Sequence, residues 1–170
     1  MRTRGAVAIV LALAVAACGD ETSPEEQAQA DARDVAMVEA ANEAMPPLEE
    51  VTPEPILFPD IERYDLLGQA CNYAPGTSLG TRVIAREADA FVKIDGEIVR
   101  LAADPGSREL PMHTRTLYSG KEYALRLQIV EEDAGEPAPD GSTNYEGNVQ
   151  LRDAYGRLVY EGTGLAQCKA

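Results

Sequence analysis

The chain of 170 residues is acidic, with 29 Asp and Glu against 15 Lys and Arg, a formal net charge of −14. A sequence without a basic patch disfavours nucleic acid and anionic lipid headgroups as partners, because both require lysines and arginines to neutralise phosphates. The charge is uneven: residues 18–60 hold twelve acidic residues and one Arg, whereas residues 61–170 hold seventeen acidic and twelve basic residues. This length and charge distribution predict one domain preceded by an acidic tether.

The first residues have the organisation of an export signal. Arg2 and Arg4 precede an unbroken run of small and apolar residues from Ala6 to Ala17. At about 1.5 Å per residue this run is roughly 18 Å long as a helix, too short for a bilayer core of about 30 Å. A basic start, a short apolar run and small residues before a cleavage point are typical of a signal peptide, here residues 1–17.

Cys18 directly follows Val15-Ala16-Ala17, and this segment resembles a bacterial lipobox. The resemblance implies cleavage before Cys18, acylation of this cysteine with chains such as palmitate, and a membrane anchor. Gly19 follows where an aspartate would retain a lipoprotein in the inner membrane, so we expect the outer membrane, with the domain facing the periplasm. The alternative is a soluble secreted protein with an incidental cysteine.

Residues 18–59 are expected to form the tether. The segment 23–26, Ser-Pro-Glu-Glu, has a capping serine, a proline suited to the first helical turn and a glutamate that completes a capping box. The following stretch favours helix up to Met45, but its apolar stripe is thin, which indicates a solvated spacer; a docking or oligomerising helix is the alternative. Five prolines in residues 46–59 predict an extended, semi-rigid linker. We therefore expect the tether to be dispensable for folding of the domain.

Residues 60–170 are expected to form the folded domain, which begins with a short helical turn over residues 60–70, capped by Asp60. The pattern then becomes β. In residues 90–102, Asp95-Gly96 predicts a two-residue hairpin turn that places Val92 opposite Val99 and Ala90 opposite Leu101.

Further segments alternate between apolar and polar residues, as expected for antiparallel strands with one side exposed to water. Tyr123, Leu125, Leu127 and Ile129 share one face, and Tyr145, Val149 and Leu151 share another. Weaker strands are expected at 71–74, 81–86, 113–118 and 157–163, and a long polar loop at 131–144. About eight short strands predict a mostly β fold, either a small antiparallel β-barrel or a sandwich.

The cysteines suggest a covalent closure of this domain. If Cys18 carries the lipid, Cys71 and Cys168 remain, one at each end of the β pattern and in a compartment that forms disulfides. We predict a disulfide bond between them. Free thiols or a metal site are the alternatives, and a single histidine without any C-x-x-C motif disfavours zinc.

Few residues point to catalysis. His113 is the only histidine, and no G-x-S-x-G motif accompanies it, so we expect an ordinary surface or half-buried histidine. Four acidic residues of one loop could gather around calcium, but they lack the order of a calcium-binding loop and indicate a solvated segment: Glu131, Glu132, Asp133 and Asp140. We therefore expect a non-enzymatic protein without a cofactor or a metal ion.

Ser119-Gly120-Lys121-Glu122-Tyr123 has the pattern S-G-x-x-Y, which resembles a motif of the membrane-bound inhibitors of C-type lysozyme. The resemblance covers residues 71–168. It implies a periplasmic β-barrel lipoprotein with a disulfide between the ends of the domain, and Ser119, Gly120 and Tyr123 as partner-binding residues. The family's second motif contains a lysine, and here Glu146 stands in its place, where it would repel the catalytic carboxylates of lysozyme.

The segment Leu66–Cys71 and the closing Gln-Cys-Lys-Ala are similar to those of uncharacterised proteobacterial envelope lipoproteins, a resemblance that implies no activity. The sequence therefore predicts a non-enzymatic, lipid-anchored envelope protein with a binding or structural role. Its expected partners are the membrane, through the acyl chains, and an envelope protein. The alternative function is a lysozyme-inhibitor-like module that binds a basic cell-wall hydrolase.

Overall fold

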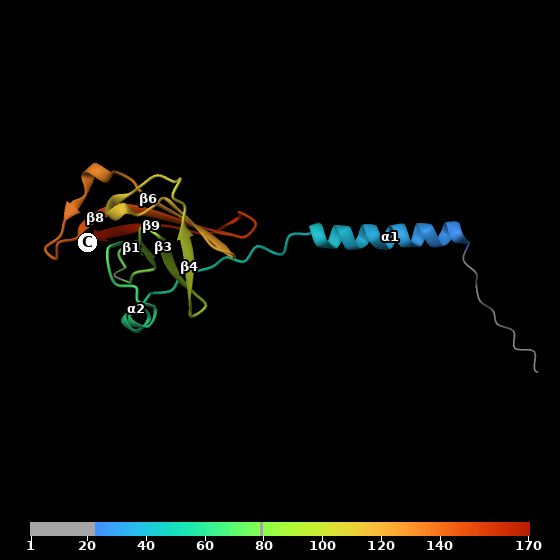
Figure 1. Cartoon of the computed structure of the whole chain (residues 1–170), viewed down its shortest axis with the longest axis horizontal. Helices are drawn as coiled ribbons and strands as arrows, with labels where there is room; N and C mark the ends of the chain where they lie inside the picture. Colours follow the sequence, from blue (N-terminus) through green and yellow to red (C-terminus); the bar gives the residue numbers. More distant parts are fainter. Residues whose placement is uncertain (1–22, 79) are drawn as a thin grey trace, which may run out of the picture. The chain divides into compact units, whose positions relative to one another are not determined.

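The computed structural model describes residues 23–78 and 80–170, which fall into two compact units divided between Met45 and Pro46 (Figure 1). The predicted signal peptide, residues 1–17, and the predicted lipidation residue Cys18 lie outside the described residues. Within the described part of the chain, no helix has the length and apolar character needed to cross a membrane.

Helix α1, Pro24–Glu43, begins with the predicted capping box. The Ser23 hydroxyl accepts a hydrogen bond from the Glu26 backbone N–H at 3.2 Å, and the Glu26 carboxylate accepts one from the Ser23 backbone N–H at 3.0 Å. The helix ends slightly before the predicted Met45. Every residue of α1 is exposed, so within its own unit the helix buries no apolar face.

The second unit is a closed β-barrel of eight antiparallel strands, which decides between the two predicted architectures (Figure 1). Its strands are β1 Ala70–Pro75, β2 Val83–Ala85, β3 Asp89–Ile94, β4 Glu97–Ala103, β5 Leu117–Ser119, β6 Tyr123–Ile129, β8 Thr143–Asp153 and β9 Leu158–Lys169. Around the barrel the order is β6-β5-β4-β3-β2-β1-β9-β8, and β8 pairs with β6 to close it. A short extra strand, β7 Glu136–Pro137, pairs with the start of β8.

The predicted hairpin of β3 and β4 forms in the predicted register. Val92 pairs with Val99 and Ala90 with Leu101, and the connecting Asp95 and Gly96 both have positive φ, 50° and 79°. Two positive φ angles are what a twisted two-residue hairpin turn requires, and Asp and Gly tolerate them well.

Side chains fill the interior of the barrel. The largest fully buried ones come from most of its strands: Tyr73, Tyr118, Leu101, Leu125, Leu127, Leu151, Val83, Val92 and Val149. The Tyr118 hydroxyl donates to the Arg86 carbonyl oxygen at 2.8 Å, and burial raises the pKa of Tyr118 to about 12. A packed interior leaves the outer surface and the ends of the barrel as places for contacts with other molecules.

Several element boundaries differ from the prediction. Strand β9 continues to Lys169, well past the predicted end at residue 163, because it pairs with β1 and β8 along its length. The sequence pattern ends the strand too early, since Gly162 and Gly164 interrupt the apolar alternation. Strand β5 begins at Leu117 because residues 111–113 form a short 3-10 helix, η1 Pro111–His113. The predicted polar loop over residues 131–144 contains a second such turn, η2 Glu132–Ala134, and strand β7.

The disulfide between Cys71 and Cys168 is present and buried, as predicted. The two cysteines lie directly opposite each other in the pairing of β1 with β9. They are separated by 97 residues, and the chain-entropy model gives a loop of this size roughly 4–5 kcal/mol of stabilisation. The bond therefore joins the two ends of the barrel sequence inside the sheet.

Residues 46–57, here called the strap, are the largest departure from the prediction. We expected a linker separate from the domain, but the strap packs on the barrel, and the compact unit begins at Pro46 rather than at residue 60. Three backbone N–H groups tie it to the barrel: Val51 donates to Val159 at 3.1 Å, Glu54 to Lys93 at 2.8 Å and Ile56 to Thr81 at 2.8 Å. Ile56 is only 5% exposed. The strap therefore runs along one end of the barrel, from β9 to β3.

Helix α2, Phe58–Tyr64, follows the strap and covers part of the outer face of β2 to β4 (Figure 1). A second apolar cluster lies beneath it: Ile56, Leu66, Ala70, Ile84 and Phe91, with Ile61 and Ile98 partly buried against them. The predicted cap is wrong in one detail. Leu57 is the N-cap, and Asp60 acts from within the first turn, where its carboxylate accepts from the Leu57 backbone N–H at 2.9 Å.

Candidate functional site

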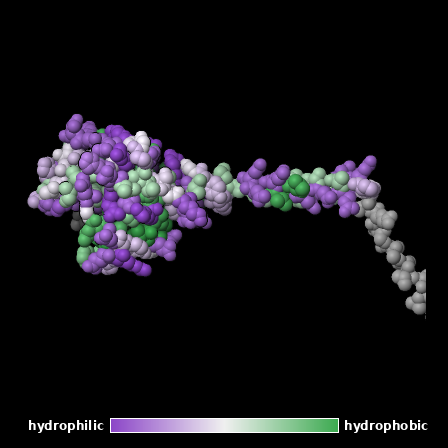
Figure 2. Space-filling model, in the orientation of Figure 1, coloured by the Kyte–Doolittle hydropathy of each residue, from purple (hydrophilic) through white to green (hydrophobic). Residues whose placement is uncertain are grey.

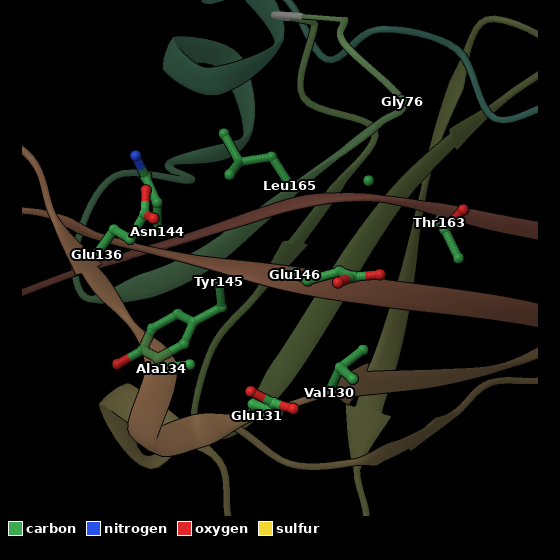
Figure 3. Close-up of a pocket in the computed structure, with 11 residues that line it drawn as sticks. Gly76, Val130, Glu131, Ala134, Glu136, Asn144, Tyr145, Glu146, Thr163 and Leu165 are labelled. Atoms are coloured by element: carbon green, nitrogen blue, oxygen red, sulfur yellow. The ribbon is translucent and has the colours of Figure 1, made fainter.

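A groove of about 600 Å³ opens where strands β6 and β8 separate (Figure 3). Figure 3 shows Glu146 and Thr163 on the wall formed by β8 and β9, and Val130 and Glu131 on the segment that faces them. The complete lining is Gly76, Val130, Glu131, Ala134, Glu136, Asn144, Tyr145, Glu146, Thr163, Gly164 and Leu165. Amide, hydroxyl, carboxyl and aromatic groups are thus combined in one open hollow.

Strand pairing explains why the groove forms at this place. The ladder between β6 and β8 ends with Ile129 opposite Gly147, and one further bond joins the Val130 N–H to the Glu146 carbonyl oxygen at 3.0 Å. After Val130 the chain turns away from β8. It returns as β7, which pairs with Thr143 and Asn144 of β8. The segment between these two pairings forms η2 and leaves the space that becomes the groove.

The charge of the groove is negative. Its lining contains three glutamates, Glu131, Glu136 and Glu146, and no Lys, Arg or His. Within the described residues, none of the three forms a salt bridge. Clefts lined by one sign of charge attract ligands of the opposite sign. The groove is therefore suited to a ligand that carries amino or guanidinium groups.

The partner-binding residues predicted from the lysozyme-inhibitor resemblance lie on the β5–β6 hairpin. Ser119 is exposed at the end of β5, and the Gly120 N–H donates to the Tyr123 carbonyl oxygen at 2.8 Å. A Cβ on Gly120 would lie 2.7 Å from Leu101 Cδ2, so the glycine permits a close approach of turn and barrel. Tyr123 packs on the core, and burial together with Glu122 raises its pKa. Packing therefore explains Gly120 and Tyr123, whereas Ser119 is free to make contacts.

Tyr123 also lines a second, smaller hollow of about 290 Å³ between the strap and the β8–β9 turn. Prolines of the strap and two tyrosines contribute to it, together with Arg157, which donates to the Pro46 carbonyl oxygen at 2.7 Å. The protein's own chain thus occupies much of this end of the barrel.

The structure places Ser119 and Glu146 at opposite ends of β6. Ser119 pairs with Ala124 near the start of that strand, whereas Glu146 bonds to Val130 just past its end. Six residue steps at about 3.4 Å each put these positions roughly 20 Å apart. The residue of the first inhibitor motif and the substitute for the second motif therefore do not form one site.

His113 is exposed, as expected, and its Nδ1 lies 2.9 Å from Glu109 Oε1. Arg115 approaches the other oxygen of the same carboxylate at 3.1 Å. The hydrogen bond with His113 is the main reason why the pKa of Glu109 is lowered. These three side chains brace the two sides of the turn formed by η1 at the end of the barrel.

Two further groups of charges have structural partners. Burial raises the pKa of Asp89, but hydrogen bonds from Arg86 and Arg100 outweigh burial, so the pKa of this carboxyl is lowered. In the acidic loop, Glu132 pairs with Arg108 at 3.1 Å and Asp140 with Lys169 at 3.6 Å. Among the residues that the structure describes, no three metal-binding side chains converge.

The sequence marks Glu131 as part of an acidic loop and Glu146 as the residue in place of the motif lysine, but it does not place the two in one groove. The available signal was a concentration of glutamates on both sides of a predicted loop, but the pairing of β6, β7 and β8 that brings them together is a tertiary feature. Comparison with known proteins adds no assignment: no family model matches the chain, and neither a curated protein nor a solved structure matches it.

Proposed function

We propose that this protein is a lipid-anchored bacterial envelope protein whose barrel binds a partner through its outer surface, without catalysing a reaction. The segment Val15-Ala16-Ala17-Cys18 carries the anchor part of the proposal, with the outer membrane and a periplasmic orientation as the location. The packed barrel interior supports binding from outside rather than inside, since side chains already fill the barrel.

The groove beside β8 is the proposed binding site, and a basic segment of an envelope protein is the proposed partner. Three glutamates along an open hollow favour several amino or guanidinium groups over one compact ion. Such binding weakens as salt is added, because exposed charges are screened within about 10 Å at 0.1 M ionic strength.

The anchor is tested by substitution of the lipobox cysteine. We expect Cys18→Ser to accumulate as uncut precursor that no longer partitions into detergent, while Thr22→Ala, a change close by in the tether, is processed and partitions normally. A Cys18→Ser protein of mature mass that still partitions into detergent contradicts the anchor.

Groove binding is tested with a tetralysine peptide by calorimetry. We expect the double variant Glu131→Gln, Glu146→Gln to bind at least about tenfold more weakly, the loss of roughly 1.4 kcal/mol. Glu97→Gln is the matched control, since Glu97 is an exposed glutamate of β4 outside the groove lining. Equal loss in the control, or no loss in the double variant, contradicts a specific site.

A second candidate is the lysozyme-inhibitor-like module, which the exposure of Ser119 on a hairpin end favours. The separation of Ser119 from Glu146, and the negative charge of Glu146, argue against it. We expect no strong inhibition of C-type lysozyme. Nanomolar inhibition that disappears in Ser119→Ala but persists in Ser107→Ala would reverse the order of the two candidates.

A further inference from the structure

Four large apolar side chains stand exposed on and beside helix α2. They are Leu57, Phe58, Tyr64 and Leu67, here called the apolar ridge, with exposed fractions of 57%, 63%, 42% and 68%. Figure 2 shows hydrophobic surface on the part of the barrel unit where α2 lies. The ridge residues contribute to neither of the apolar clusters, so they are not required for the packing of the barrel.

The ridge is held on a well-anchored support. Ile61 of α2 and Leu66, just after the helix, pack into the second apolar cluster. Lys93 Nζ lies 2.9 Å from Asp60 Oδ2, which joins α2 to β3. The Leu66 N–H donates to the Ile61 carbonyl oxygen at 3.0 Å and closes the turn after the helix. The inward residues fix the helix, and the apolar ridge is left facing solvent.

The shape and charge of the ridge fit a lipid surface better than a protein groove. The ridge lines neither of the hollows described above, and it lies on a helix outside the sheet (Figure 1). Aromatic and aliphatic side chains on a projecting element, here including Phe58 and Tyr64, are typical of insertion at the membrane interface. The charges close by nearly balance, since Glu62 and Asp65 are accompanied by Arg63, and Lys93 neutralises Asp60. Neutral headgroups suit this surface better than anionic ones.

The proposed anchor identifies which surface lies within reach. Between Cys18 and Pro46 the chain contains helix α1, about 30 Å long, and about nine further residue steps of at most about 3.5 Å each. The barrel therefore stays within roughly 60 Å of the acylated cysteine. Confinement of this kind gives an effective concentration on the order of millimolar, at which a weak contact becomes populated.

We propose that the apolar ridge of α2 docks on the neutral surface of the bilayer that holds the acyl anchor. This inference rests on the proposed lipid anchor. The anchor supplies the affinity, and the ridge sets how the barrel is turned toward the membrane.

The test uses the absence of tryptophan from the sequence, which makes Phe58→Trp a single fluorescent reporter. The chain from Cys18 has one free thiol, because Cys71 and Cys168 are joined. That thiol is coupled to a maleimide lipid in phosphatidylcholine vesicles, so the docking test does not depend on natural acylation. We expect a blue shift and loss of most of the emission when the vesicles contain brominated acyl chains. Tyr155→Trp, at an equally exposed position on the β8–β9 turn, should show neither change.

Two further arms separate the possible occupants. Adding Leu67→Ser to the Phe58→Trp chain should reduce the quenching of tryptophan emission severalfold without changing the melting temperature. Brominated vesicles of phosphatidylglycerol should quench this emission less than brominated vesicles of phosphatidylcholine. Coupled protein without quenching overturns the docking proposal and leaves the anchor untouched. A blue shift that rises with protein concentration in the absence of vesicles identifies a second copy as the occupant and overturns it as well. The proposed acylation is tested separately in cells, by the processing and detergent partitioning of Cys18→Ser.

Discussion

Helix α1 and the strap are neighbours in the sequence, and both belong to the predicted tether, yet they are stabilised in opposite ways. Helix α1 satisfies its own backbone and caps its start with Ser23 and Glu26, and it buries no residue. The strap has no internal secondary structure, and its N–H groups at Val51, Glu54 and Ile56 bond to the barrel.

The comparison shows that an acidic, proline-rich segment is not necessarily a spacer. Extended backbone cannot satisfy its own hydrogen bonds, so it is either solvated or paired with another segment. In the strap, Ile56 and the buried Pro53 supply the apolar contacts, and the Arg82 side chain donates to the Pro53 carbonyl oxygen at 2.8 Å. Buried apolar residues and hydrogen-bond partners on the barrel together therefore place the strap in the paired state.

Truncation gives the largest expected difference between the two regions. A chain that begins at Pro46 lacks α1 and should keep the melting temperature of the barrel. A chain that begins at Pro59 also lacks the strap and should lose about 5 kcal/mol of unfolding free energy, from Ile56 and several hydrogen bonds of about 1 kcal/mol each. Thermal denaturation of both chains provides the measurement. Equal melting temperatures would mean that the strap is only a linker.

Single substitutions in the two regions should also have different effects. Ile56→Ala should lower the free energy of unfolding by about 3 kcal/mol, because Ile56 is buried in the second apolar cluster with Ile84 and Phe91. Val38→Ala removes an apolar side chain from α1 that is 59% exposed and should leave that free energy unchanged. Urea denaturation of the two variants gives both values. A comparable loss in Val38→Ala would indicate that α1 docks on another surface.

The cap of α1 should have a smaller and purely local effect. Ser23→Ala removes the acceptor for the Glu26 N–H and should cost the helix about 1 kcal/mol. Far-UV circular dichroism should report the loss of helix, while the melting temperature of the barrel stays the same. Thr22→Ala, just outside the capping box, serves as the control. A lower melting temperature in Ser23→Ala would show that the helix and the barrel are energetically coupled.

The smallest expected effects appear on acidification. A hydrogen bond from Lys93, and a second from the Leu57 backbone, lower the pKa of Asp60 below its ordinary value, and hydrogen bonds from Ser23 lower the pKa of Glu26 in the same way. Each pKa is lower in the folded than in the unfolded chain, so each contribution is present near neutral pH and is lost as the pH falls through the lowered value.

The two carboxyl groups should differ in what their protonation changes. Loss of the Asp60 contribution should lower the melting temperature of the barrel, and Asp60→Asn should remove that part of the pH dependence. Loss of the Glu26 contribution should reduce only the circular dichroism signal of α1, and Glu26→Gln is its control. If Glu26→Gln alters the pH dependence of barrel melting, the two regions are not independent.

Local sequence was sufficient to predict the elements whose stabilising contacts are close in the chain. The capping box at Ser23, the Asp95-Gly96 turn and the register of β3 with β4 all depend on residues a few positions apart, and all three predictions are confirmed. The mostly β fold and the Cys71–Cys168 bond are also confirmed, because period-two alternation and cysteine placement can be recognised without knowing the topology.

The choice between barrel and sandwich required the three-dimensional structure, because closure depends on the pairing of β6 with β8, which no local pattern encodes. The same holds for the groove, since Glu131 and Glu146 come together where that pairing ends, and for the strap, whose hydrogen-bond partners lie far along the chain. The apolar alternation of the strands and the tight turn at Asp95-Gly96 follow from the sequence alone, because both depend on neighbouring residues. The fold decides which apolar side chains are covered and which remain exposed on α2. The reason is that strands and strap must find hydrogen-bond partners for their backbones in one common arrangement.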